Sequence, residues 1–164
     1  MRRGYTIHQS SLLGAVTLVV CEEGVEEIFL EGDHFESYHR EHPDLRQDED
    51  LCQEAKKQIE EYFKGERQVF DVPLVTKGTP FQEKVWEVLK QIPYGETISY
   101  GEVAKRIGNP KAVRAVGAAS KRNPIPLIIP CHRVIGKNGK MVGYMGSHID
   151  IKEKLLAHEL NYQS

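Results

Sequence analysis

Three adjacent residues, Cys131, His132 and Arg133, are the clearest candidates for covalent chemistry in this sequence. The thiolate is the nucleophilic form of cysteine, and neighbouring basic groups favour it. His132 could act as the general base, through a water molecule, because side chains of adjacent residues rarely meet directly. Such a base needs a third group, usually a carboxylate, to orient it. The pattern predicts an activated thiol whose orienting acid lies elsewhere in the chain.

Glu159 is the best candidate for that acid. It lies in the last turn of a predicted helix, where the helix dipole disfavours a negative charge. It projects from the same apolar side as Ile151, so we expect an interior partner. His158 lies on that side too and stays a rival for the role. Each residue also has an ordinary alternative, since a lone cysteine is often a small buried hydrophobe and an inward glutamate can form a purely structural salt bridge.

The segments around the cysteine are predicted to aim it. Three prolines precede it within seven residues, at Pro124, Pro126 and Pro130. Proline cannot donate to a strand ladder, so we predict an extended, stiff segment there. After the cysteine, Asn138-Gly139 is a hairpin turn signal and predicts a β-hairpin wing. The final helix is predicted from about Asp150 to Leu160.

A helix-turn-helix is predicted before the prolines. Thr79-Pro80 begins a helix that Pro93-Tyr94-Gly95 ends, and Ser99 begins a short helix that runs to Ile107. Asn109-Pro110 predicts an immediate third helix to about Lys121. The third helix combines basic and small residues: Lys111, Arg114, Ala115, Gly117, Lys121 and Arg122. Such a slim, basic helix favours DNA, and the ordinary alternative is close packing against a neighbouring helix.

The first part of the chain predicts a different architecture. Strand-like segments at residues 5–8, 14–20 and 25–30 predict an antiparallel meander. Residues 32–46 are polar and predict a loop, and Asp48 to Lys64 predicts a helix that Gly65 ends. The fold class is therefore α+β, with a small sheet domain and linker at 1–79 and a mostly helical domain at 80–164.

Charge divides the chain in the same way. The 164 residues carry a net charge of -2, which taken alone argues against nucleic acid. Residues 1–79 hold a balance of -8 and residues 80–164 a balance of +6. Such asymmetry indicates an anionic partner such as nucleic acid for the second half, although a solvated basic face is the ordinary alternative.

Several classes of protein are excluded. Cys21, Cys52 and Cys131 are too few and too widely spaced for a disulfide framework, which favours a reducing cytoplasm. The cysteines and histidines show no paired zinc-ligand spacing, and no glycine-rich phosphate loop is present. No apolar run approaches the roughly 20 residues that span a bilayer. We therefore expect neither a metal nor a cofactor, and no membrane partner.

The segment Pro130-Cys131-His132-Arg133-Val134-Ile135 resembles the active-site motif of the O6-alkylguanine-DNA alkyltransferases. The resemblance extends over residues 80–159. It includes Ile98-Ser99-Tyr100, Asn109-Pro110, Arg114-Ala115-Val116-Gly117, Asn123-Pro124-Ile125-Pro126, Gly143-Tyr144 and Leu155-Leu156-Ala157-His158-Glu159. Residues 1–79 match mainly in size and in their strand-then-helix order. The resemblance implies a ribonuclease-H-like first domain and a winged helix-turn-helix second domain.

The resemblance also implies a function, which is direct-reversal repair of double-stranded DNA. The protein would flip out a guanine alkylated at O6 and move the alkyl group irreversibly to Cys131; O4-alkylthymine stays open as a substrate. His132 and Glu159 would activate the thiol, and Asn123 would fix this network. Tyr100 would assist flipping and protonate the purine, and Arg114 would replace the extruded base. Further substrate or DNA contacts are assigned to Ala115, Gly117, Lys121, Arg122, Arg133, Val134 and Tyr144.

Some properties remain open at this point. Met145-Gly146-Ser147 departs from the small residue and Gly-Gly usual in the family, so the accepted alkyl groups are not fixed. We expect a monomer, with cooperative binding along DNA left open. The expected location is the cytoplasm, at the nucleoid when bound to DNA, or the nucleus in a eukaryote.

Three other functions compete with alkyl transfer. A non-catalytic relative that only binds alkylated DNA would replace Cys131, which is present here. A winged-helix regulator with a thiol sensor would not explain why Tyr100, Asn123 and Glu159 occur together. A Cys-His hydrolase would need an oxyanion arrangement, which is not evident, and would not need the basic helix.

Overall fold

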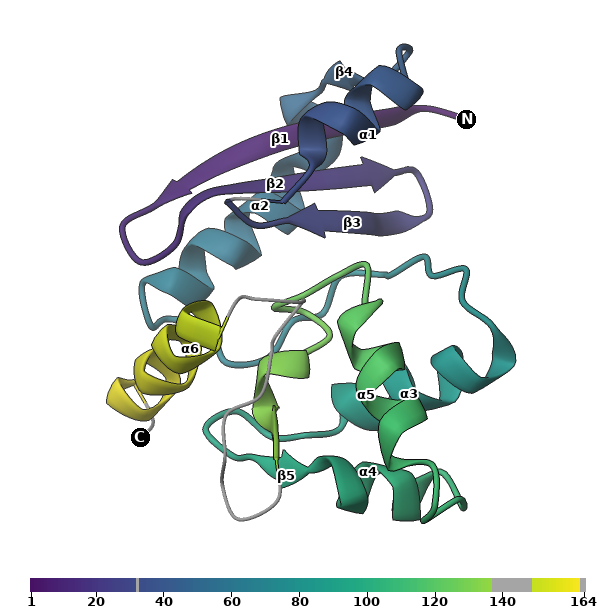
Figure 1. Cartoon of the computed structure of the whole chain (residues 1–164). Coiled ribbons are helices and arrows are strands. Elements are labelled where there is room, and N and C mark those ends of the chain that lie inside the picture. Colours follow the sequence, from purple (N-terminus) through teal and green to yellow (C-terminus); the bar gives the residue numbers. More distant parts are fainter. Residues whose placement is uncertain (32, 137–148, 163–164) are drawn as a thin grey trace. The chain divides into compact units, whose positions relative to one another are not determined.

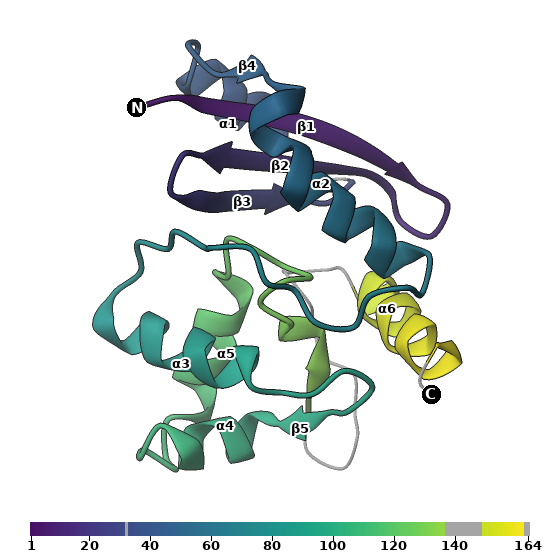
Figure 2. The same ribbon diagram turned by 180° about the vertical axis from the view of Figure 1, so that it is seen from behind.

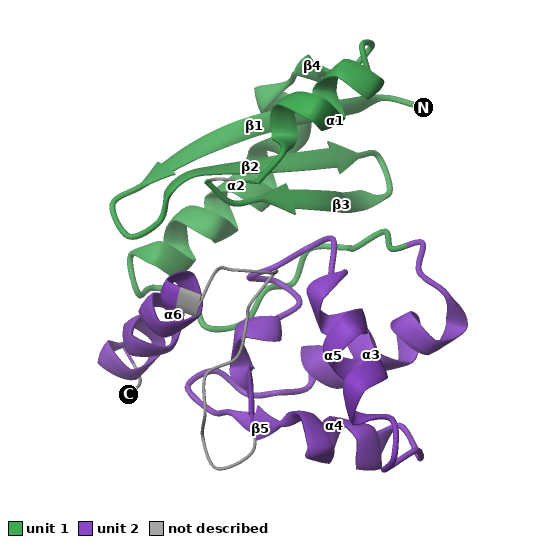
Figure 3. Cartoon of the chain, in the orientation of Figure 1, with its two compact units in different colours: residues 1–76 green, residues 77–164 purple. Residues whose placement is uncertain are grey.

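Residues 1–76 and 77–164 form two separate units (Figure 3). The structure is a computed structural model that describes residues 1–31, 33–136 and 149–162. Across these residues, no helix is long and apolar enough to cross a membrane.

A four-stranded sheet forms the centre of the first unit. The strands β1 (Arg3–Ser10), β2 (Gly14–Cys21) and β3 (Gly24–Phe29) form the predicted antiparallel meander. The sheet order is β3-β2-β1-β4, and the two-residue β4 (Arg46–Gln47) adds a parallel edge. Helix α2 (Glu49–Phe63) covers one face of the sheet and α1 (Phe35–Glu41) the other, as Figures 1 and 2 show from opposite sides.

The sequence predicts α2 correctly but misses α1 and β4. Asp48 caps α2 by accepting a hydrogen bond from the Leu51 N–H, and Gly65 ends it with a positive φ of 78°. The predicted loop at residues 32–46 is wrong where it contains α1 and Arg46, the first residue of β4. Phe35 contacts the rings of Tyr5 and Phe29 across the sheet, so packing against distant residues stabilises a helix that its polar composition does not indicate.

The second unit is mostly helical. In chain order its elements are α3 (Pro80–Lys90), β5 (Ile98–Ser99), α4 (Tyr100–Arg106), α5 (Val113–Lys121), the 3-10 turn η1 (Cys131–Arg133), β6 (Val134–Ile135) and α6 (Ile149–Asn161). Thr79 and Gln82 form a reciprocal capping box at the start of α3. The Trp86 indole N–H donates to the Ala119 carbonyl at 2.9 Å and joins α3 to α5. The predicted α+β fold is thus confirmed.

A short strand pair connects two distant parts of this unit. Strands β5 and β6 run parallel, with Ile98 opposite Val134 and Ser99 opposite Ile135. Because β5 leads directly into α4 and β6 directly follows η1, the pair holds Tyr100 near Cys131. The prediction that Ser99 begins the short helix is confirmed, because its side chain accepts a hydrogen bond from the Glu102 N–H; the resemblance also placed Ile98 on this helix, and Ile98 is strand.

Two further expectations need correction. The third helix begins at Val113, because residues 109–112 form a turn in which the Ala112 N–H donates to the Asn109 carbonyl. The segment from 124 to 130 is not extended: the Ile129 N–H donates to the Ile125 carbonyl, and Leu127 adopts a φ of 76°. Proline excludes strand pairing but not a turn, so the predicted extended shape is wrong, and the stiffness of the segment stays a prediction. The predicted hairpin at Asn138-Gly139 lies outside the described residues.

Candidate active site

Cys131 begins the η1 turn and is 1% exposed. The Asn123 amide nitrogen donates to the Cys131 Sγ at 3.2 Å and to the Ile129 carbonyl at 2.7 Å. The Asn123 amide oxygen accepts from the Ile125 N–H at 2.9 Å. One buried side chain therefore holds both the turn before the cysteine and the sulfur itself.

The buried His132 contacts the carboxylate of Glu159. Its Nε2 lies 2.6 Å from the Glu159 Oε2, and both side chains are fully buried. A carboxylate can only accept, so Nε2 carries the proton and donates it. Nδ1 is then the ring nitrogen with a lone pair, as a general base requires.

Glu159 is also bound by Arg133 and by the backbone. The Arg133 guanidinium donates to both carboxylate oxygens, from Nε at 2.9 Å and from Nη2 at 3.0 Å. The Gly95 N–H donates to Oε1 at 3.2 Å. A bidentate arginine pair of this kind fixes a carboxylate geometrically as well as electrostatically.

The position of Arg133 corrects its predicted role as a DNA contact. Its side chain is 7% exposed, Nη1 donates to the Ile92 carbonyl at 2.7 Å, and the guanidinium lies 5.5 Å from the centre of the Tyr94 ring. A guanidinium engaged inward in this way is not presented to phosphates. Adjacent basic residues in a sequence do not reveal which of them turns inward.

Electrostatics in this cluster suit a base and its orienting acid. Burial lowers the pKa of His132, although the hydrogen bond that His132 donates to Glu159 acts in the opposite direction, and the imidazole is therefore neutral near pH 7. Burial alone would raise the pKa of Glu159, but the hydrogen bonds and charges of His132 and Arg133 outweigh it and hold that pKa well below its usual range. Glu159 is thus ionised, and the neutral His132 ring can accept a proton at Nδ1.

The structure separates Glu159 from its rival. The His158 ring contacts the Tyr162 ring in a tilted arrangement, with centroids 4.9 Å apart, whereas Glu159 accepts a hydrogen bond from His132. The eight-residue spacing from Ile151 correctly predicts an inward acid, since Ile151 and Glu159 are both buried.

The predicted DNA-contacting residues of α5 lie on its exposed side. Arg114, Ala115, Lys121 and Arg122 are exposed, and Gly117 is half-buried with open space where a Cβ would lie. Val116, Ala119 and Ser120 form the buried side. Basic and small residues therefore share one accessible surface.

The remaining predicted residues lie around the cysteine. Tyr100 is half-buried at the start of α4, and Val134 is buried in β6 directly after η1. Tyr144 lies outside the described residues. Sequence reasoning missed Lys152, which is fully buried on α6 and whose Nζ lies 3.5 Å from the Tyr100 hydroxyl. It lies seven residues before Glu159 and so on the same side of α6, but a lysine at that position gives no sign in the sequence that it is buried.

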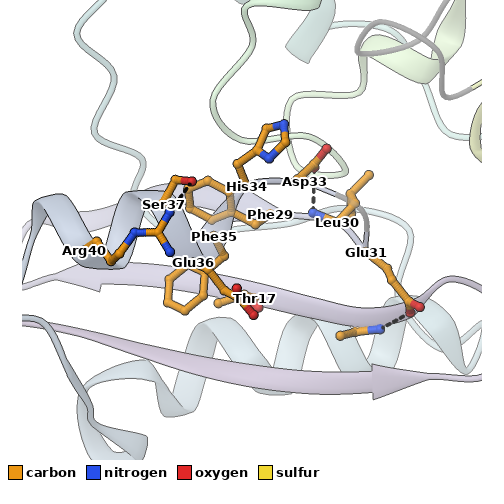
Figure 4. Close-up of a pocket in the computed structure, with 11 residues that line it drawn as sticks. Thr17, Phe29, Leu30, Glu31, Asp33, His34, Phe35, Glu36, Ser37 and Arg40 are labelled. Carbon is orange, nitrogen blue, oxygen red and sulfur yellow. Dashed lines mark hydrogen bonds between the residues drawn. The ribbon is translucent and has the colours of Figure 1, made fainter.

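A pocket in the first unit offers an alternative location (Figure 4). It has a volume of about 320 Å³, and its lining includes Phe29, His34 and Arg40. Two of its carboxylates bind backbone groups nearby, since Glu31 accepts from the Ala15 N–H and Asp33 from the Leu30 N–H. No cysteine is among its lining residues. Among the residues that the structure describes, no group of three or more His, Cys, Asp or Glu side chains could hold a metal ion.

Two family models match the two parts of the chain. The 6-O-methylguanine DNA methyltransferase DNA-binding domain matches residues 80–161, and the ribonuclease-like domain of the same proteins matches residues 1–76. The chain belongs to the 6-O-methylguanine DNA methyltransferase family. The resemblance noted in the sequence is thereby confirmed, and Cys131, His132 and Glu159 all lie in the part that matches the DNA-binding domain.

Individual members of the 6-O-methylguanine DNA methyltransferase family are similar over nearly the whole chain. A methylated-DNA–protein-cysteine methyltransferase of Methanosarcina acetivorans is 52% identical, covering 94% of this chain and 97% of its own. The constitutive enzyme of that name from Bacillus subtilis is 47% identical, covering 88% of each chain. The structure of Mycobacterium tuberculosis OGT in complex with DNA superposes with a TM-score of 0.86 at 40% identity, covering 97% of this chain and 94% of that one.

Proposed function

We propose that this chain repairs double-stranded DNA by moving an alkyl group from the O6 atom of guanine to the Cys131 sulfur, once per protein molecule. The observation that carries the proposal is the hydrogen bond that His132 donates to the buried, ionised Glu159. His132 directly follows Cys131, whose sulfur accepts a hydrogen bond from Asn123. Family membership and the relatives named methylated-DNA–protein-cysteine methyltransferase support the same reaction.

The proposed transfer balances within these groups. The Cys131 thiol gives its proton to His132 Nδ1 through water, and Glu159 stabilises the imidazolium that forms. The thiolate attacks the alkyl carbon, an S–C bond forms and the C–O6 bond breaks. The electron pair of the broken bond stays on the guanine, which takes a proton from Tyr100, and the His132 imidazolium returns the thiol proton to the Tyr100 phenolate through water. The thioether does not release the alkyl group, so each molecule acts once and needs no cofactor.

The proposed DNA interface is the exposed side of α5. An atom inside a duplex is out of reach of Cys131, so the base must be flipped out at a cost of about a few kcal/mol, least for a poorly paired base. A slim helix with an inserting side chain suits the minor groove. Lys121 and Arg122 would contact phosphates and make binding salt-dependent. We infer that residues 80–164 form the DNA-binding alkyltransferase domain and that it works in the cytoplasm.

The deciding experiment is mass spectrometry after incubation with a duplex that contains O6-methylguanine. We expect one added methyl group on the peptide that contains Cys131, in a stoichiometry that stops at one per protein. Binding of this duplex without any modification of Cys131 would contradict alkyl transfer and favour a non-catalytic protein that binds alkylated DNA. A panel of larger alkyl groups would define the substrate range.

Replacing Arg114 by alanine should impair repair in duplex DNA more than transfer from free O6-benzylguanine. Arg114 is exposed on α5 and is proposed to fill the space left by the flipped base. Without it, the cost of unstacking is not offset, and we expect transfer from duplex DNA to slow on the order of tenfold or more. Single-turnover rates with both substrates check this, and equal losses would remove Arg114 from the flipping role.

Replacing Gly117 by leucine should weaken DNA binding without destabilising the fold. A Cβ at this position meets open space, so Gly117→Leu can be accommodated in the free protein and should raise helix stability by about 0.5–1 kcal/mol. The added side chain would hold α5 away from the DNA backbone and weaken duplex binding. Thermal unfolding and duplex affinity, measured together, check this. Unchanged affinity would show that this side of α5 does not approach DNA closely.

A further inference from the structure

Lys152 is a buried cation with no role in the proposed reaction as described above. It lies on α6, two turns before Glu159, and its relative exposure is 0%. An ammonium group carries three donors and loses much of its hydration when buried, so a buried lysine normally lies against a carboxylate. Within the described part of the chain, no carboxylate lies within ion-pair distance of it.

The groups that do surround Lys152 belong to the reaction. Its Nζ lies 3.5 Å from the Tyr100 hydroxyl and 5.5 Å from the centre of the Tyr100 ring. Helix α6 packs against η1, which carries Cys131 and His132. Arg133 and Glu159 neutralise each other in the same cluster, so their charges leave that of Lys152 uncompensated.

Electrostatic interactions connect the same residues. Burial lowers the pKa of Lys152 to about 8, while the charge of Cys131 acts in the opposite direction and raises it. Burial likewise raises the pKa of Tyr100 to about 12, and Cys131 adds to that rise. Tyr100 is therefore protonated in the free protein, where it can act as a proton donor, and Lys152 is still charged near pH 7.

We propose that Lys152 is a positioning residue of the alkyl-transfer site, whose ammonium is the counter-charge of the Cys131 thiolate and orients the Tyr100 hydroxyl. An ammonium can only donate, so the phenol oxygen accepts from Lys152 and its own O–H points away, available to an acceptor on the flipped base. When Cys131 gives its proton to His132, the negative charge forms near a cation that is already in place. The part of the proposal that concerns Tyr100 rests on the proposed function. The part that concerns the ionisation of Cys131 does not depend on it.

The first test is the pH dependence of Cys131 alkylation by iodoacetamide in the free protein. Lys152→Met keeps the length of the side chain and removes its charge, and it should shift the midpoint upward by about one pH unit. Lys154→Met is the matched control, since Lys154 is exposed on the same helix, and it should leave the midpoint unchanged. Lys152→Arg should restore most of the shift. A folded Lys152→Met protein with the wild-type midpoint would overturn the proposal.

A second test needs no variant. The 13Cε resonance of Lys152 in the wild-type protein reports its titration near pH 8 before and after Cys131 is capped with iodoacetamide. Capping removes the thiolate, so the Lys152 midpoint should fall; an unchanged midpoint would refute the pairing. If the wild-type protein takes no methyl group from DNA while this midpoint does fall, the proposed function fails and the pairing stands.

Discussion

Replacing Cys131 by serine should abolish alkyl transfer and leave DNA binding intact. A hydroxyl is a far weaker nucleophile than a thiolate near neutral pH, and His132 cannot ionise it to a comparable extent. The serine oxygen can still accept the Asn123 hydrogen bond, so the turn before η1 keeps its support. We expect no methylated protein by mass spectrometry and a duplex affinity within about twofold of wild type, since phosphate contacts supply most of that affinity.

Cys52 supplies the control for this experiment. It is fully buried in the first unit, and burial raises the pKa of its thiol to about 12, so it holds almost no thiolate near pH 7. Cys52→Ala should therefore keep full transfer stoichiometry. Methylation of the Cys131→Ser protein at another cysteine would contradict the assignment of the nucleophile.

Removing the carboxylate of Glu159 should have the largest effect on stability together with a large effect on rate. Glu159→Ala leaves the Arg133 charge buried without its partner, which costs about 3–5 kcal/mol in comparable buried pairs. It also leaves His132 without an orienting acceptor, and loss of general-base assistance slows transfer on the order of a hundredfold or more. Urea unfolding and single-turnover kinetics measure the two effects separately.

Two features make the Glu159 result specific. Glu153→Ala removes an exposed carboxylate from the same helix and should change neither quantity measurably. The pKa of Glu159 is lower in the folded protein than its ordinary value of 4.5, so its contribution to stability is complete above that pH and declines as the pH falls below it. The stability difference between wild type and Glu159→Ala should decline in the same window. A difference that is constant with pH would show that the carboxylate charge is not its cause.

The sequence predicts the parts of the site that depend on local pattern. The apolar spacing on α6 indicates that Glu159 points inward, and the capping residues correctly mark the starts of α3 and α4. The segment of small and basic residues correctly predicts the accessible surface of α5. In each case the periodicity of one element is sufficient, because the side that a residue occupies follows from its position along that element.

The parts that the sequence does not predict depend on contacts between distant segments. Arg133 turns inward because Glu159 and the Ile92 carbonyl lie there, and neither neighbours it in sequence. Helix α1 forms because aromatic rings of the sheet meet Phe35. Lys152 reads as an ordinary surface lysine until its contact with Tyr100 is seen. Tertiary packing overrides local preference in all three cases.

The pairing of β5 with β6 has a consequence for how such a protein can diversify. The pairing of Ile98 with Val134 brings together the two ends of a long segment that contains α4, α5 and the turn around Leu127. Cys131 and Tyr100 lie near those joined ends, whereas the exposed residues of α5 lie in the middle of this segment. Substitutions, insertions or deletions in its middle can therefore change DNA affinity without altering the spacing of the reacting groups. Recognition can evolve in this architecture while the chemistry is conserved.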